Sequence, residues 1–220
     1  MEERNPVRCA VLGIGAQGRK YALMLHRGEA PGLVLSAVCC RSGSSAAWAR
    51  ENLGPGVRIV QDEDGLYRDA GSFDAVIIAT PHRQHPAMTV RALWSGKHVL
   101  CDKPAGITAA DAAAMSEAAA RSGRVYALIC NQWAYPMNRR IREMLEEERI
   151  GKPVRVTQIN SRNFRTRWYH ESSTWRSSWR GEGGGALING AYLSAWRGER
   201  IPFSIDRNAY EQMLKDRMPG

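Results

Sequence analysis

The chain of 220 residues lacks the features that mark secreted, membrane-spanning and metal-binding proteins. No apolar run reaches the roughly 20 residues needed to cross a bilayer, and the charged stretch MEERNPVRCA has no apolar signal-peptide segment. The five cysteines are odd in number and form no C-x-x-C pair. We therefore expect reduced core thiols, no metal site, no membrane partner and a cytoplasmic location.

Acidic residues are too few to balance the basic ones, and the net charge is +9. That excess is compatible with a nucleic-acid partner, an anionic cofactor or only a basic surface. The segment 155–180 holds six arginines and one acid, interleaved with Trp168, Tyr169, Trp175 and Trp179. Such a segment can hold single-stranded nucleic acid. It equally suits a sugar site, where aromatic rings stack on the sugar and arginines bond its hydroxyls.

The stretch 7–18, VRCAVLGIGAQG, places a G-x-G-x-x-G turn after an apolar strand, 7–12, and before a helix, 16–27. In this pattern Gly13 allows a tight turn, Gly15 lets a pyrophosphate approach the backbone, and Gly18 lets the helix pack closely. The helix N-terminus offers free N–H groups to the phosphates. A second strand, 33–39, closes a βαβ unit. The pattern predicts dinucleotide binding by Gly13, Gly15, Gln17 and Gly18.

Strands and helices alternate through the first half of the chain, which predicts a parallel α/β sheet. The further elements expected there are strands at 57–60, 73–79, 98–101 and 125–130, and helices at 44–52, 62–68, 85–94, 109–121 and 137–149. Thr108 caps one of these helices, and Gly123 ends it. Beyond them we expect strands at 154–159 and 200–205 and helices at 186–196 and 206–218. No period is sustained over 160–185.

The end of the second strand distinguishes the two nicotinamide cofactors. An acid about 20 residues beyond the glycines binds the ribose hydroxyls of NAD, but here the chain has Cys40, Arg41 and Ser42. A guanidinium and a hydroxyl there would pair with a 2′-phosphate, which a carboxylate would repel. We therefore expect Arg41 and Ser42 to select NADP, with NAD possible. The alternative is that Arg41 is a solvated surface residue.

Four segments resemble the glucose-fructose oxidoreductase, inositol dehydrogenase and rhizopine catabolism family (Gfo/Idh/MocA). They are GIGAQG at 13–18, ATPHRQH at 79–85, GKHVLCDKP at 96–104 and LEEERIGKPVRV at 145–156. The resemblance implies nucleotide-dependent oxidation or reduction of sugars, cyclitols and related polyols. It also implies a Rossmann domain followed by an α+β domain with an open sheet that often forms a dimer interface.

The family's Glu-Lys-Pro stands here as Asp102, Lys103 and Pro104. The resemblance implies that Lys103 lies beside the nicotinamide and the reacting carbon, with Asp102 at the cofactor. A lysine at the carboxyl end of a parallel strand also lies where such sheets bind ligands, and it can assist proton transfer. The alternative is a lysine that ends a strand in solvent. Thr80 and Pro81 are expected on the nicotinamide side.

His85 matches a family histidine near the cofactor, but a histidine that begins a helix is as often structural. We assign it to the cofactor site with both interpretations open. The catalytic residues assigned from the sequence are Lys103 and Tyr169.

The family's second-domain histidine has no counterpart, because no histidine follows Asn189. Residues 1–189 resemble the first part of the family, and residues 189–220 resemble its C-terminal end. We infer an internal deletion. The expected fold is therefore α/β, with a Rossmann-type parallel sheet over 1–131 and a shortened α+β second domain over 132–220.

Three functions follow, in decreasing order of support. The first is an NADP(H)-dependent oxidoreductase acting on a small sugar or polyol, with a homo-oligomer possible. The second is a catalytically inactive nucleotide-binding remnant of that family. The third, a nucleic-acid binder acting through Arg155–Arg180, is least favoured.

Overall fold

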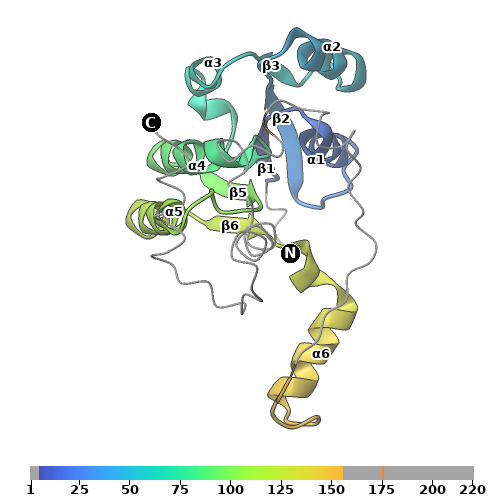
Figure 1. The fold of residues 1–220 in the computed structure, drawn as a ribbon. Coiled ribbons are helices and arrows are strands. Elements are labelled where there is room, and N and C mark those ends of the chain that lie inside the picture. The colour runs from blue at the N-terminus through green and yellow to red at the C-terminus, as the bar shows by residue number, and fades with distance from the viewer. Residues whose placement is uncertain (1–4, 156–174, 176–220) are drawn as a thin grey trace.

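A computed structural model of the protein describes residues 5–155 and Trp175 (Figure 1). These residues include the expected dinucleotide-binding domain from residue 5 on and the first residues of the expected second domain. The elements expected beyond residue 155 lie outside the described residues, as does most of the expected strand 154–159. Val154 and Arg155 themselves are not in a strand.

The centre of the fold is a parallel sheet of six strands in the order β3-β2-β1-β4-β5-β6. Apolar and β-branched residues make up most of these strands, as expected for strands covered on both faces. Their bounds are β1 (Val7–Leu12), β2 (Leu33–Cys39), β3 (Arg58–Val60), β4 (Ala75–Ile78), β5 (His98–Asp102) and β6 (Tyr126–Ile129). The predicted α/β class with a Rossmann-type sheet is confirmed.

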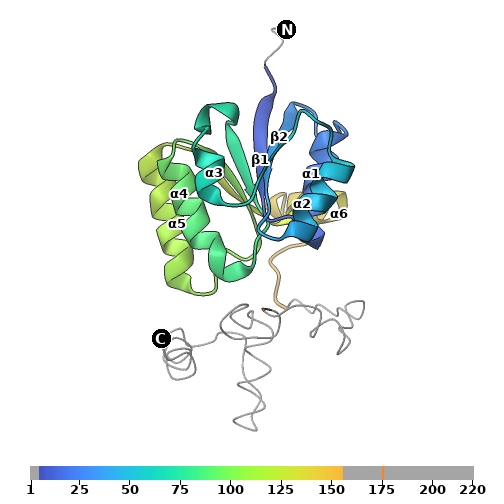
Figure 2. The same cartoon turned by 90° about the horizontal axis from the view of Figure 1, so that it is seen from above.

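Helices cover both faces of the sheet (Figure 2). One face carries α1 (Ala16–His26) and α2 (Gly43–Asn52), and the other carries α3 (Glu63–Tyr67), α4 (His85–Trp94) and α5 (Ala109–Ser122). After β6, α6 (Pro136–Glu146) runs away from the sheet (Figure 1). Three short 3-10 helices that the sequence did not predict are η1 (Ala70–Ser72), η2 (His82–Gln84) and η3 (Asn131–Ala134).

Two buried clusters lie on the two faces because neighbouring residues of a strand point to opposite sides. On β1, Val11 packs with Ala22 of α1 on one face, and Leu12 packs with Leu93 of α4 on the other. The same alternation divides β2 and β4 between the clusters. A core on each face explains why the central strands contain almost no polar residues.

The ends of two helices follow from local chemistry. Thr108 begins α5 with a capping box in which its hydroxyl accepts from the Asp111 N–H, and Gly123 ends it with φ 63°. The predicted helix 137–149 is wrong at its end, because α6 stops at Glu146 and Glu148 adopts φ 54°. Consecutive carboxylates at a helix C-terminus are opposed by the helix dipole, which disfavours continuation.

The five cysteines, which lie in strands or directly after them, are free and mostly buried. Cys9, Cys39, Cys40 and Cys101 are buried, whereas Cys130 is exposed. Burial raises the pKa of the Cys9 thiol to about 11 and those of Cys39 and Cys101 to about 12. These thiols are therefore protonated and poorly nucleophilic at neutral pH. Over the described residues, no helix has both the length and the apolar character that a membrane crossing requires.

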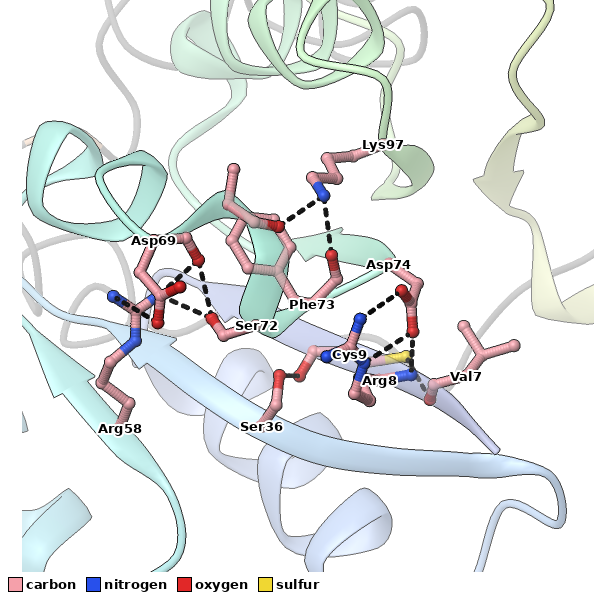
Figure 3. Close-up of polar contacts among 11 residues, drawn as sticks. Val7, Arg8, Cys9, Ser36, Arg58, Asp69, Ser72, Phe73, Asp74 and Lys97 are labelled. Atoms are coloured by element: carbon pink, nitrogen blue, oxygen red, sulfur yellow. Dashed lines mark hydrogen bonds and ion pairs between the residues drawn. The ribbon is translucent and has the colours of Figure 1, made fainter. Parts of the chain in front are cut away.

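A polar cluster joins three segments at the amino ends of β1, β4 and β5 (Figure 3). The Arg8 guanidinium donates to both carboxylate oxygens of Asp74, at 3.0 and 2.7 Å, and the Arg8 backbone N–H donates to the same carboxylate. The Lys97 ammonium donates to the carbonyls of Ala70 and Phe73 and lies over the Phe73 ring. The cluster holds together the amino ends of these three strands, at the opposite end of the sheet from the glycine turn.

Asp74→Asn should lower the stability of the fold in a pH-dependent way. The hydrogen bonds from Arg8 hold the pKa of the Asp74 carboxyl at about 2, below its ordinary 3.8. Because the pKa is depressed in the folded state, the stabilisation is present above the ordinary pKa and is lost as pH falls toward 2. Urea midpoints of wild type and variant should differ at neutral pH and converge in acid.

Glu117→Gln provides the control, since Glu117 forms an exposed pair with Arg121 within α5. Such pairs contribute little, so this variant should match wild type at every pH. A difference between Asp74→Asn and wild type that stays constant down to pH 2 would contradict the assigned role.

Candidate functional site

The predicted cofactor residues lie at the carboxyl ends of β1, β2, β4 and β5, in the loops there, in the last residue of β5 or in the first turn of the following helix. The strand order reverses between β1 and β4, because β2 and β3 lie on one side of β1 and β4 to β6 on the other. Ligands of open parallel sheets bind at this point. Neighbouring strands lie about 4.8 Å apart, so the loops after β1 and β5 are separated by ~10 Å.

The glycine turn shows a different constraint at each glycine. Gly13 has φ 91°, and a Cβ there would lie 2.8 Å from the Thr80 methyl. A Cβ on Gly18 would collide with the Gly13 carbonyl oxygen, so α1 packs directly on the turn. A Cβ on Gly15 would meet nothing within 4 Å. Two glycines therefore build the turn, and the third leaves space above it.

The N-terminus of α1 faces that space without a side-chain cap. Gly15 is its N-cap residue, and the first turn of α1 carries no acid. Unpaired N–H groups and the positive end of a helix dipole favour an anion at this position. Gln17 is exposed in the first turn of α1. The open position at Gly15 and the uncapped helix together fit a pyrophosphate.

The loop after β2 gathers hydroxyl groups beside the glycine turn. Ser42 caps α2 by accepting the Ser45 N–H at 3.2 Å, and its hydroxyl also contacts the hydroxyls of Ser44 and Ser45. The Ser45 hydroxyl donates to the carbonyl of Ile14, which ties α2 to the turn. Arg41 is exposed next to this cluster, and the first turn of α2 has no acid. Arg41 and this hydroxyl cluster fit a phosphate, and Glu63 at the start of α3 is the carboxylate within electrostatic range of Arg41.

The loop after β4 lies against the glycine turn through Thr80. The Thr80 methyl is the first atom that a Cβ on Gly13 would meet. The Thr80 hydroxyl donates to the Met88 sulfur at 3.4 Å. Pro81 follows and is partly buried. His85, at the start of α4, is completely buried, and both of its ring nitrogens lie 2.8 Å from backbone carbonyl oxygens, those of Pro104 and Thr80. Of the two interpretations left open by the sequence, this geometry matches the structural one.

The loop after β5 presents an exposed lysine. The Asp102 carboxylate accepts the Lys103 backbone N–H at 2.9 Å, and the Lys103–Pro104 peptide bond is cis. The Lys103 side chain is exposed, while Asp102 is partly buried. Tyr21 of α1 is half-buried near Gln17 and Asp102, and burial followed by the Asp102 charge raises the pKa of its phenol. An exposed ammonium group therefore lies just after the carboxyl end of β5.

Several residues around the candidate site, at the carboxyl ends of the strands, were not predicted from the sequence. Ser44 and Ser45 belong to the hydroxyl cluster, and the S-G-S-S run after a strand was the available signal. Tyr21 had no signal beyond its place on an apolar helix face. The catalytic candidate Tyr169 lies outside the described residues. Among the described residues, no group of three or more His, Cys, Asp or Glu side chains could hold a metal ion.

The comparisons with known proteins agree with this geometry. The model of the Gfo/Idh/MocA family, described as an oxidoreductase family with an NAD-binding Rossmann fold, matches residues 7–129. A 1,5-anhydro-D-fructose reductase of Ensifer adhaerens is 32% identical over 67% of this chain and 43% of its own length. An inositol 2-dehydrogenase of Acidiphilium cryptum is 29% identical over 68% and 44%. The chain thus spans less than half the length of these relatives.

Two solved structures show the same fold. The WlbA dehydrogenase of Chromobacterium violaceum, in complex with NADH and UDP-GlcNAcA, has TM-score 0.70 at 20% identity, covering 86% of this chain and 53% of its own. A 3-ketoreductase of Actinomadura kijaniata, in complex with TDP-benzene and NADP, has TM-score 0.58 at 26% identity, covering 67% and 44%.

Gly15→Val should abolish dinucleotide binding and leave the fold intact. The added side chain would enter open space above the turn, which is the space a pyrophosphate needs. Gly18→Val should instead unfold the protein, because its side chain would strike the Gly13 carbonyl. Nucleotide titration and thermal unfolding of both variants distinguish these outcomes.

The matched control is Gly56→Val, since a Cβ on Gly56 also meets nothing within 4 Å. It should bind nucleotide as wild type does. Normal affinity in a folded Gly15→Val protein would show that the turn binds no dinucleotide.

Proposed function

The chain belongs to the Gfo/Idh/MocA family of oxidoreductases, and we propose that it transfers a hydride between NADP(H) and a sugar, cyclitol or related polyol. One observation carries the proposal. The open glycine turn after β1 and the exposed Lys103 after β5 lie at the same edge of one sheet. The names of the relatives, a reductase of an anhydro sugar and an inositol dehydrogenase, support this substrate class.

The cofactor would be held by three neighbouring loops. The α1 N-terminus and the backbone at Gly15 would receive the pyrophosphate, and Arg41 with Ser42 would receive the adenosine end. Thr80 and Pro81 would border the nicotinamide end near Lys103. The bound nicotinamide would supply the hydride donor or acceptor, and this chain's residues would orient it.

Lys103 would serve as the proton donor and acceptor. In the reducing direction, a hydride bonds to the carbonyl carbon of the substrate, and the Lys103 ammonium gives a proton to the carbonyl oxygen. The product is an alcohol and a neutral amine. Because Lys103 is exposed, the amine regains its proton from water. Alcohol oxidation is the reverse, with the amine accepting the hydroxyl proton.

NADP(H) is favoured over NAD(H) by the charges around Arg41. A 2′-phosphate is a dianion, and an arginine binds it with paired charge-assisted hydrogen bonds. The loop after β2 offers Arg41, three clustered serine hydroxyls and the N-terminus of α2, with no carboxylate in the first turn of α2. One of the similar solved structures contains NADH and another contains NADP. The proposed preference for NADP(H) therefore rests on the loop after β2.

Arg41→Ala should weaken NADPH binding by at least about tenfold, because a charge-assisted hydrogen bond contributes roughly 1.5–3 kcal/mol. NADH affinity should change little, since NADH has no 2′-phosphate. Arg50→Ala removes an exposed arginine near the other end of α2 and is the control. Fluorescence titration of both nucleotides gives the affinities. Equal affinity of the wild-type protein for the two cofactors would refute the preference.

Lys103→Met should lower kcat by at least ~100-fold, the contribution expected of a positioned acid and base. The dissociation constant of NADPH should remain near that of wild type. Lys152→Met, which changes another exposed lysine, should retain full turnover. The assay is a panel of inositols, aldoses and ketoses in both directions. Nucleotide binding without turnover on any of them would favour the inactive nucleotide-binding remnant.

A further inference from the structure

The loop after β3 brings a carboxylate close to the end of β2, where the sequence itself has no acid. β2 and β3 are paired with Cys39 opposite Val60, and the Cys40 N–H donates to the Val60 carbonyl at 2.9 Å. The chain leaves β3 at Val60, and α3 begins at Glu63. Because neighbouring strands lie about 4.8 Å apart, Arg41 and Glu63 follow strand ends that lie side by side.

The Glu63 side chain is turned toward the fold. It is 23% exposed, whereas that of its neighbour Asp64 is 79% exposed, and α3 packs against both β2 and β3. Burial raises the pKa of the Glu63 carboxyl, and of the nearby charges Arg91 lowers it, Asp64 raises it and Arg41 lowers it. Beyond burial, the pKa of the Cys39 thiol is raised by Glu63 and lowered by Arg41. Glu63 and Arg41 therefore both lie around the last residue of β2.

The contact between Glu63 and Arg91 is a loose one. Nη1 of Arg91 lies 3.9 Å from Oε2 of Glu63, which is beyond hydrogen-bond distance. Arg91 donates instead to the Asp64 carboxylate at 2.6 Å, and its guanidinium lies over the Tyr67 ring. The Glu63 charge is thus not taken up by a direct hydrogen-bonded ion pair with Arg91, and it acts on its other cationic neighbour, Arg41.

The two nicotinamide cofactors differ in charge at the place where Arg41 and Glu63 meet. NADPH carries a phosphate dianion on the adenosine ribose, and NADH carries a hydroxyl there. A phosphate bonded to Arg41 lies within electrostatic range of Glu63 and is repelled by it. A neutral hydroxyl is not repelled. Glu63 therefore discriminates between the two cofactors in the opposite sense to Arg41.

We propose that Glu63 is a second specificity-determining residue, whose carboxylate opposes the 2′-phosphate that Arg41 attracts and so limits the preference for NADP(H) over NAD(H). This role rests on the proposed function, because it requires the adenosine end of the cofactor at the loop after β2. The acid that usually ends the second strand of such a sheet is replaced here by one that begins α3. The balance of Arg41 and Glu63, and not Arg41 alone, sets the ratio of the two affinities.

The test is a titration of the full chain with NADPH, NADH, adenosine 2′,5′-bisphosphate and AMP, the last two carrying the adenosine end alone. Glu63→Gln keeps the size of the side chain and removes its charge. At low ionic strength it should bind NADPH and the bisphosphate about threefold or more tightly than wild type. Its affinities for NADH and AMP should not change. The gain should shrink at roughly 1 M salt, which screens charges within about 3 Å, whereas a gain from altered packing would persist.

Two further variants serve as controls. Glu63→Asp keeps the charge and should retain the wild-type ratio of affinities. Glu51→Gln changes the net charge by the same amount as Glu63→Gln, but at an exposed position near the other end of α2 from Arg41. It should bind all four ligands as wild type does. Thermal unfolding shows whether each variant is folded.

Unchanged affinity for NADPH and the bisphosphate in folded Glu63→Gln would overturn the role of Glu63 and leave the preference for NADP(H) standing. Weaker binding of NADH with unchanged binding of NADPH would also overturn it, because Glu63 would then bind the ribose hydroxyls. A wild-type protein that binds none of the four ligands would refute the proposed cofactor site, and this role with it.

Discussion

The close approach of α1 to the first turn is the constraint on which the site depends. There is no room for a side chain on Gly18, because the Gly13 carbonyl oxygen occupies that position, and Gly13 itself is pressed against the loop after β4. These two contacts set the end of β1, the start of α1 and the path of the chain at Thr80 together. The remaining glycine, Gly15, is left beside open space and an uncapped helix end.

The amino and carboxyl ends of the strands differ in what they do. Contacts at the amino ends stabilise the fold, and the candidate site lies at the carboxyl ends. At the amino ends of the strands, Arg8 pairs with Asp74, and the Lys97 ammonium donates to the carbonyls of Ala70 and Phe73. At the carboxyl edge, Arg41 and Lys103 are exposed, and His85 supports the loops from beneath. Ligands of open parallel sheets bind outside the carboxyl ends of the strands, which is where these two exposed cations lie.

Much of this arrangement follows from the sequence because its signals are local. The glycine spacing, the apolar strands and the Thr108 cap each report on a few consecutive residues, and the parallel sheet, the helices that cover it and the cap of α5 by Thr108 are as predicted. The α6 end was misplaced because no glycine or proline occurs from Met137 until Gly151, whereas the helix already ends within the acidic run 146–148. The 3-10 helices have no comparable signal.

The long-range contacts of the site could not be predicted in the same way. The bridge from His85 to Thr80 and Pro104 joins residues up to 19 positions apart, and the bond from Ser45 to Ile14 spans 31. Such contacts depend on where whole strands lie relative to one another. The sequence therefore located the loops of the site but left the role of His85 undecided.

A crystal structure of the chain with bound NADPH tests the central claim most directly. We expect the pyrophosphate over Gly15 at the N-terminus of α1, the 2′-phosphate bonded to Arg41, and the nicotinamide next to the Lys103 ammonium. A nucleotide bound at another surface, or a nicotinamide ring beyond the reach of Lys103, would contradict it.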